Sequence, residues 1–229
     1  MSMGKVGSWL ENYWYHYKWH TIVVLFFVVV LAVTIPQFCA KEDADIQILY
    51  AGPVVPDQDT AQSFSNAFAS LLAEDYNGDG KKLVNLSSIF VMTDAQIKEL
   101  TDRGGAVSSD AMYNSRQQLG MYLFDGETLI CLLDPAWYAQ YQETGAFLPW
   151  EESLGYTPEG AMDAYAIRLK DTAFGTYFSE TFAGLPEDTV LCMRRYPTAN
   201  AVKNQKNATV RYEQHLAFFR ALVTFDLKK

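Results

Sequence analysis

Charged side chains that could hold a small ligand stand at the ends of several strand-like segments. Arg168, Arg194 and Arg195 lie at or just beyond such segments, and an arginine there can bind a carboxylate or a phosphate through two parallel hydrogen bonds. Asp134 and Asp171 lie in similar places and could receive an amine. The alternatives are that Asp134 caps a helix, because a proline follows it, and that the arginines pair with surplus acidic residues.

Catalysis and metal binding have little support in the sequence. It contains no G-x-S-x-G, H-E-x-x-H or Walker-type glycine motif, and none of its histidines is spaced with a cysteine or carboxylate as in a metal site. The segment 75–82, DYNGDGKK, resembles the first half of a calcium loop, but Leu86 stands where the bidentate glutamate is required. We therefore favour a turn built by aspartate, asparagine and glycine, and we expect no catalytic residue, no metal and no cofactor.

Two of the three cysteines, Cys131 and Cys192, lie in apolar, strand-like runs. The favoured interpretation is two small buried side chains, and a disulfide between neighbouring strands is an alternative that the sequence leaves open. Three cysteines are too few for a disulfide scaffold or a structural zinc site.

Strand-like and helix-like segments alternate after residue 45. Five strands are predicted, over residues 46–51, 83–91, 128–133, 165–169 and 189–193. Helices are predicted to begin at Asp57 or Asp59, at the capping box of Thr93 and Gln96, at Ser109 and at Asp134, with a last helix over residues 208–224. This alternation predicts an α/β domain with a mostly parallel sheet and helices on both faces.

Small ligands on such a sheet bind beyond the carboxyl ends of the strands, at a switch in strand order. The turn at Gly52 and Pro53 and the helix start that carries Trp137 therefore join the charged residues above as predicted ligand-binding positions. Aromatic side chains are expected to cover the apolar part of a ligand, namely those of Tyr50, Trp137, Tyr138 and Trp150.

An unbroken apolar run precedes this domain. No charge occurs between Lys18 and Lys41, and a helix over residues 19–38 matches the hydrocarbon core of a bilayer, about 30 Å thick. Aromatic residues ahead of it fit an interfacial belt. A cleaved signal requires a small residue where Phe38 stands, and a buried soluble helix would show a polar stripe. The predicted organisation is a cytoplasmic or interfacial segment at 1–18, an uncleaved transmembrane helix at 19–38, a linker at 39–44 and a domain at 45–229.

The balance of charge predicts the orientation and narrows the partners. Lys5 and Lys18 precede the apolar run and acidic residues dominate directly after it, so the N-terminus is expected in the cytoplasm and the domain outside a plasma membrane crossed once. The chain has 18 Lys+Arg against 27 Asp+Glu, a net charge of −9. Such an acidic chain repels nucleic acid and anionic headgroups, so neither is an expected partner.

Three segments resemble parts of bacterial extracellular solute-binding proteins. They are ETLICLLDPAWYAQYQETGAFLPWEE (127–152), AYAIRLKDTAFGTYF (164–178) and YEQHLAFFRALVTF (212–225). Together with the aromatic-rich anchor they are similar to membrane-anchored proteins of Gram-positive bacteria of the clostridial type.

The resemblance implies a periplasmic-binding-protein-like fold and a small-molecule solute that is handed to a membrane transporter or sensed. The stretch between the third and fifth predicted strands is too short for a complete second lobe, so a single lobe or a reduced pair is expected. The alternative function is an envelope interaction or assembly protein that keeps the fold without a ligand.

Overall fold

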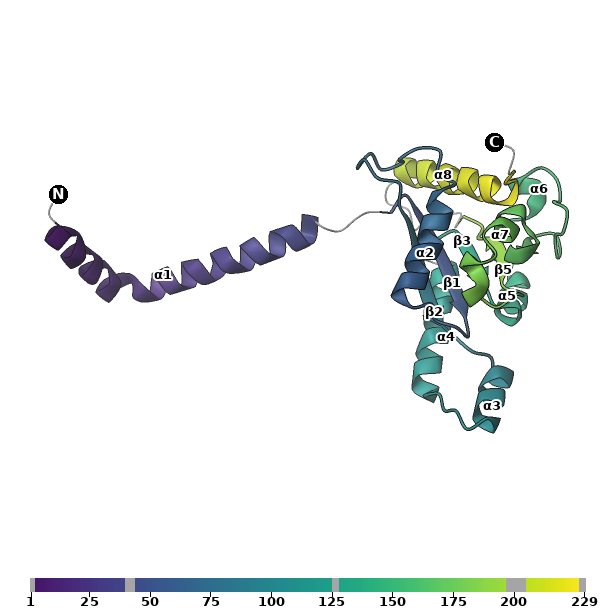
Figure 1. Ribbon diagram of the computed structural model, residues 1–229, viewed down its shortest axis with the longest axis horizontal. Coiled ribbons are helices and arrows are strands. Elements are labelled where there is room, and N and C mark those ends of the chain that lie inside the picture. Colours follow the sequence, from purple (N-terminus) through teal and green to yellow (C-terminus); the bar gives the residue numbers. More distant parts are fainter. Residues whose placement is uncertain (1–2, 40–43, 125–127, 197–204, 227–229) are drawn as a thin grey trace. The chain divides into compact units, whose positions relative to one another are not determined.

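The computed structural model of the protein describes residues 3–39, 44–124, 128–196 and 205–226. The chain separates into two compact units, residues 1–43 and residues 44–229. This boundary lies within the predicted linker, of which residues 40–43 fall outside the described residues. The first unit contains one described helix, and the second contains a sheet with its surrounding helices (Figure 1).

The first unit is the helix α1, Met3–Cys39, which begins well before residue 19. It includes a 20-residue segment, Tyr13–Ala32, with a mean hydropathy of 1.4 and no buried part. Within the described residues this is the one helix that is long and apolar enough to cross a membrane. The hydroxyls of Thr21 and Thr34 donate to carbonyl oxygens four residues earlier, at 3.0 and 2.6 Å, so the helix satisfies these polar groups itself.

The second unit is built on a five-stranded sheet in the order β2-β1-β3-β5-β4. The bounds of the strands are β1 Ile46–Gly52, β2 Val84–Phe90, β3 Ile130–Leu133, β4 Ala166–Arg168 and β5 Val190–Met193. β1 pairs in parallel with β2 and β3, whereas β5 pairs antiparallel with β3 and β4. All the other strands therefore run in one direction and β5 runs against them, which confirms a mixed α/β fold with a mostly parallel sheet.

Helices cover both faces of this sheet. Their bounds are α2 Gln58–Ala69, α3 Asp94–Asp102, α4 Ser109–Phe124, α5 Pro135–Gln142, α6 Trp150–Ser153, η1 Leu169–Asp171, α7 Ala173–Tyr177, η2 Thr181–Gly184 and α8 Gln205–Val223. One core contains side chains from α2, α6, α7, η2 and α8, and a second core on the other face contains side chains from α4 and α5. α3, which is described in full, buries none of its side chains.

The direction of β5 follows from the segment before it. Residues 169–189 contain only short helices and return to the edge of the sheet where β4 ended. A strand that follows such a return without a crossover is antiparallel. The register places Val190 beside Leu133, so β5 begins at the edge where the other strands end.

Local signals set where the helices begin. The side chain of Asp57 accepts the N–H of Thr60 at 2.8 Å at the start of α2. Thr93 Oγ1 accepts the N–H of Gln96 at 3.2 Å, and Gln96 Oε1 accepts the N–H of Thr93 at 2.8 Å, at the start of α3. These contacts satisfy N–H groups that have no partner inside a helix, and they confirm the predicted caps.

A buried carboxylate at the start of β1 fixes the turn that precedes β2. Asp45 accepts the N–H groups of Tyr76 (2.7 Å) and Asn77 (3.1 Å) through Oδ1 and that of Leu83 (2.9 Å) through Oδ2. Asp45→Asn places an amide NH2 against at least one of these donors. We expect the free energy of unfolding to fall by about 2 kcal/mol, as measured by denaturant titration.

The matched control for this prediction lies in the same turn. Asp79 is exposed and accepts an N–H at 2.8 Å, so Asp79→Asn should leave stability within about 0.5 kcal/mol of the unchanged chain. Equal denaturation midpoints for the Asp45→Asn and Asp79→Asn variants would contradict the role given to Asp45.

Candidate functional site

The carboxyl edge of the sheet contains the switch in strand order. From β1 the chain passes to β2 on one side and later to β3 on the other side. The carbonyl oxygen of Ala51 accepts the N–H of Asp134 at 2.9 Å, and that of Gly52 accepts the N–H of Val91 at 3.0 Å. Gly52, Pro53 and Asp134 therefore lie together where ligands of open α/β sheets bind.

The carboxylate of Asp134 accepts hydrogen bonds from two protein groups. Its Oδ1 accepts the N–H of Ala136 at 2.9 Å at the start of α5, and its Oδ2 accepts Nε2 of Gln96 at 2.7 Å. Asp134 is buried. The helix-cap interpretation is thus confirmed, and both carboxylate oxygens already accept protein donors.

Gly52, the last residue of β1, lies against the side chain of Tyr50. A Cβ at Gly52 would lie 2.5 Å from the hydroxyl oxygen of Tyr50, which covers this position. The pKa of Tyr50 is raised to about 12, chiefly by burial; a backbone hydrogen bond at Val54 acts in the opposite direction, and the carboxylates of Asp134 and Asp188 add smaller upward contributions. Tyr50 is therefore a neutral phenol, and its ring lies in the core rather than on an open surface.

A pair of nitrogen donors beside this edge was not predicted. The guanidinium carbon of Arg116 lies 5.5 Å from the ring centroid of Trp137, and Nη2 donates to Met92 O (3.0 Å) and Asp94 Oδ1 (2.6 Å). Arg116 Nε and Trp137 Nε1 are buried and have no acceptor in the described structure. Arg116 sits in the middle of α4, so only the packing of α4 reveals its place next to the predicted residue Trp137.

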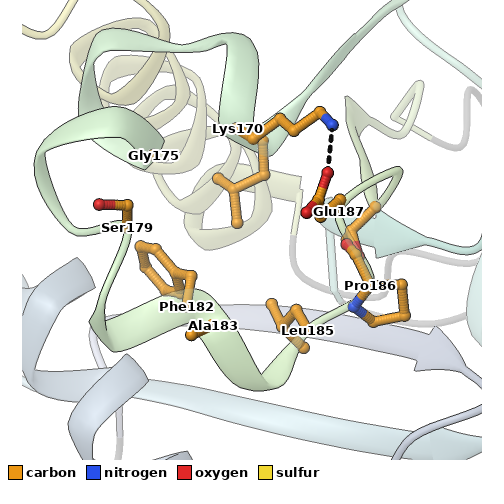
Figure 2. Close-up of a pocket in the computed structure, with 10 residues that line it drawn as sticks. Lys170, Gly175, Ser179, Phe182, Ala183, Leu185, Pro186 and Glu187 are labelled. Atoms are coloured by element: carbon orange, nitrogen blue, oxygen red, sulfur yellow. Dashed lines mark hydrogen bonds and ion pairs between the residues drawn. The ribbon is translucent and has the colours of Figure 1, made fainter.

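A cavity of about 430 Å³ lies in the segment between β4 and β5 (Figure 2). Its apolar lining includes Leu169, Phe182 and Leu185, all of which are buried. Lys170 and Glu187 also line it, and Lys170 Nζ lies 2.9 Å from Glu187 Oε2. Because β4 ends and β5 begins at the carboxyl edge of the sheet, this cavity belongs to that same edge.

Of the predicted ligand-binding residues, Arg168 and Asp171 lie next to the cavity, whereas Arg194 and Arg195 lie at the opposite edge of the sheet. Arg168 ends β4 and pairs with Asp171 at 3.7 Å on η1, next to the lining residues. Arg194 and Arg195 follow β5 and therefore lie at the opposite edge, where the N–H of Arg194 donates to Leu129 O. The structure does not bring the three arginines into one site, because β5 is antiparallel.

The two arginines after β5 have structural partners of their own. Arg194 is buried, and its Nη1 donates to Leu123 O at 3.1 Å. Arg195 binds Glu152 through both terminal nitrogens, at 3.2 and 2.9 Å. Arg195 and Arg168 therefore pair with acidic residues, Glu152 and Asp171 respectively, as the alternative interpretation of the arginines predicted.

All four aromatic residues expected to cover a ligand belong to the two cores. Tyr138 donates its hydroxyl to both carboxylate oxygens of Asp163 at 2.8 Å, and Trp150 Nε1 donates to Asp163 O at 2.9 Å. Trp150 also stacks on Phe219 with ring centroids 5.7 Å apart. Burial, followed by the hydrogen bond to Asp163, raises the pKa of Tyr138. Asp163 was not predicted, because nothing in its local sequence marks a shared acceptor.

The turn that resembled a calcium loop is held by its own backbone. Asp75 accepts the N–H groups of Gly78 and Gly80, both at 2.7 Å, and these glycines have positive φ angles of 75° and 86°. The hydrogen bond from Gly80, the largest cause, lowers the pKa of the Asp75 carboxyl. The described residues contain no group of three or more His, Cys, Asp and Glu placed to hold a metal.

Cys131 and Cys192 face each other across the β3–β5 pair. Both are free and fully buried, and Cys192 Sγ lies 3.9 Å from Cys131 O. Burial raises the pKa of the Cys192 thiol, which keeps it in the neutral form. In this structure the two residues pack as small buried side chains.

No family model, curated protein or solved structure matches this chain. The candidate site therefore rests on the geometry of the chain itself. Its elements are the switch point at Gly52 and Asp134, the Arg116–Trp137 pair, and the cavity between β4 and β5.

Proposed function

We propose that this protein is a membrane-tethered, extracytoplasmic binding domain, related to bacterial solute-binding proteins, that takes a small solute for transport or sensing. The observation that carries the proposal is the cavity between β4 and β5, at the carboxyl edge of the sheet. The candidate membrane helix supports the tether.

The surface of α1 supports the membrane tether. Large apolar side chains of residues 22–31 are exposed, including Phe26 (62 %) and Leu25 (61 %), and the second unit has its own separate cores. An apolar helix of this length is stable in a bilayer of about 30 Å and costly to keep in water. With the positive charges before it, this favours a single span with the N-terminus in the cytoplasm.

The size and lining of the cavity support a role in binding a small solute. A volume of about 430 Å³ falls within the usual range for small-ligand sites, roughly 300–1,000 Å³. Such sites combine an apolar lining with a few polar groups, as Phe182 and Leu185 do here with the Lys170–Glu187 pair. The cavity shares with ligand sites of open α/β sheets the edge at which the parallel strands end, although it lies beside β4 and β5 and not at the switch in strand order next to β1.

A thermal-shift screen of the full chain in detergent tests this function. The panel contains sugars, amino acids, peptides and organic acids. A ligand at 100 times its dissociation constant should stabilise the protein by about 2.7 kcal/mol. Ala183→Trp, at the exposed rim of the cavity, should fill it and abolish the response. Ala173→Trp is the control, because Ala173 is exposed on α7 outside the lining and should leave the response unchanged.

The alternative of an envelope interaction protein has one observation in its favour. α3 buries no side chain, and the neighbouring α4 exposes Tyr113 (63 %), Met121 (61 %) and Phe124 (49 %). A flat response across the panel would contradict solute binding and favour this alternative. A response that Ala183→Trp leaves intact would contradict binding in the cavity and place the solute elsewhere on the protein.

A further inference from the structure

We propose that the solute is a zwitterionic amino acid with a large apolar side chain, bound between Lys170 and Glu187 at the cavity between β4 and β5. This inference rests on the proposed function, since it uses the same cavity. The feature that carries it is an opposite-charge pair in a lining that is otherwise mostly apolar, with the hydroxyl side chains of Ser179 and Thr189 as its other polar groups (Figure 2).

The ion pair is accessible and readily exchanged. Lys170 Nζ lies 2.9 Å from Glu187 Oε2, and the two side chains are 46 % and 88 % exposed. An ion pair this exposed contributes little to stability. A charged group of a ligand can therefore replace Glu187 as the partner of Lys170, or Lys170 as the partner of Glu187, with little loss of folding free energy. The pair thus offers one cation and one anion at the same point of the cavity wall.

A zwitterion is the ligand class that uses both charges. Its α-carboxylate meets Lys170 and its α-ammonium meets Glu187, and these two groups sit on one carbon atom, which suits a pair already in contact. A ligand with a single charge would separate the pair and satisfy only one side. A neutral ligand would use neither charge.

The apolar part of the cavity lining favours a ligand with a large apolar side chain. Leu169, Phe182 and Leu185 are almost fully buried and present carbon atoms to the cavity. Figure 2 shows Phe182 and Leu185 on a different side of the cavity from the Lys170–Glu187 pair, so a ligand held by its charges can extend its side chain toward them. Burial of that side chain removes apolar surface from water and favours leucine or phenylalanine over alanine.

Calorimetric titration of the full chain in detergent tests the ligand class. The probes are L-phenylalanine, N-acetyl-L-phenylalanine, which lacks the ammonium, L-phenylalaninamide, which lacks the carboxylate, and L-alanine, which lacks the apolar side chain. L-phenylalanine should bind at least about tenfold more tightly than each of the other three.

Variants assign each charge to its partner. Lys170→Met should remove the preference for L-phenylalanine over its amide and keep the preference over the N-acetyl compound, and Glu187→Gln should do the reverse. Lys98→Met is the matched control, because Lys98 forms a similar exposed ion pair with Asp102 (2.6 Å) on α3.

The outcomes separate this inference from the proposed function. Equal affinity for L-phenylalanine, its N-acetyl derivative and its amide contradicts a zwitterionic ligand and leaves solute binding intact. Binding that Lys170→Met and Glu187→Gln leave unchanged also contradicts a zwitterionic ligand. A panel in which no compound of any class binds overturns both.

Discussion

Replacing Gly175 with alanine should lower the free energy of unfolding by at least about 4 kcal/mol. A Cβ at this position would overlap the carbonyl group of Leu169, with Thr172 Oγ1 only 3.1 Å away. Neither neighbour can move freely. Leu169 O accepts the hydroxyl of Thr172 at 2.7 Å, and the N–H of Leu169 donates to Thr189 O at 2.9 Å, which ties this turn to the start of β5.

Denaturant titration measures the effect of this change, and Gly184→Ala is its control. A Cβ at Gly184 would make ordinary contacts, 3.6 Å from Thr60 Cγ2 and 3.8 Å from the ring of Phe64, so a change within about 1 kcal/mol is expected. Because Gly175 lines the cavity, its alanine variant should also lose any solute response. A Gly175→Ala protein as stable as the Gly184→Ala protein would contradict the described packing of α7 on η1.

The second large effect is a loss of stability in mild acid, caused by His215. This side chain is fully buried, Nδ1 lies 2.8 Å from Arg211 O, and Nε2 accepts the N–H of Gln47 at 3.5 Å. A neutral ring with its proton on Nδ1 satisfies both contacts. Burial, the largest cause, lowers the pKa of His215 to about 4.

The pH window follows from the two states of this histidine. An unfolded chain binds the proton near pH 6.5, whereas the folded chain does so only near pH 4. Between these values the unfolded state carries more protons, so acidification favours unfolding. The contribution of His215 is complete above about pH 6.5, and about 3 kcal/mol of stability is lost as the pH falls to 4.

Urea midpoints measured from pH 7.5 to 4 test this prediction. His215→Gln should be less stable than the unchanged chain at pH 7.5 and should show a flatter pH dependence. His16→Gln is the control, because His16 is exposed on α1 and should leave the slope unchanged. Parallel curves for the chain with and without His215 would contradict a buried, neutral imidazole.

Much of the fold could be predicted because its signals are local. The capping box of Thr93 and Gln96 and the Asp134–Pro135 start both reappear with their hydrogen bonds. The apolar run of β3 marks a strand that is buried on both faces. Each of these signals depends on a few adjacent residues, so no knowledge of the tertiary structure is required.

The site could be predicted only in part because it depends on strand direction. Nothing near Val190 shows that β5 runs against β3, yet this decides that Arg195 lies at the edge opposite Arg168. The cavity is lined by short helices of three to five residues between 169 and 184, which are too short to show a helical period. Lys170 and Glu187 come together only because that segment returns on itself.

The central position of β1 has a mechanical consequence. The second unit begins at Ala44, two residues before β1, so a force that pulls on the chain from α1 is first borne by β1. This strand is not at an edge: it pairs from Ile46 to Gly52 with β2 and from Ile48 to Ala51 with β3. Tension along β1 therefore loads two parallel ladders in shear at once, and the second unit resists unfolding from its N-terminal end more than it would if an edge strand carried the load.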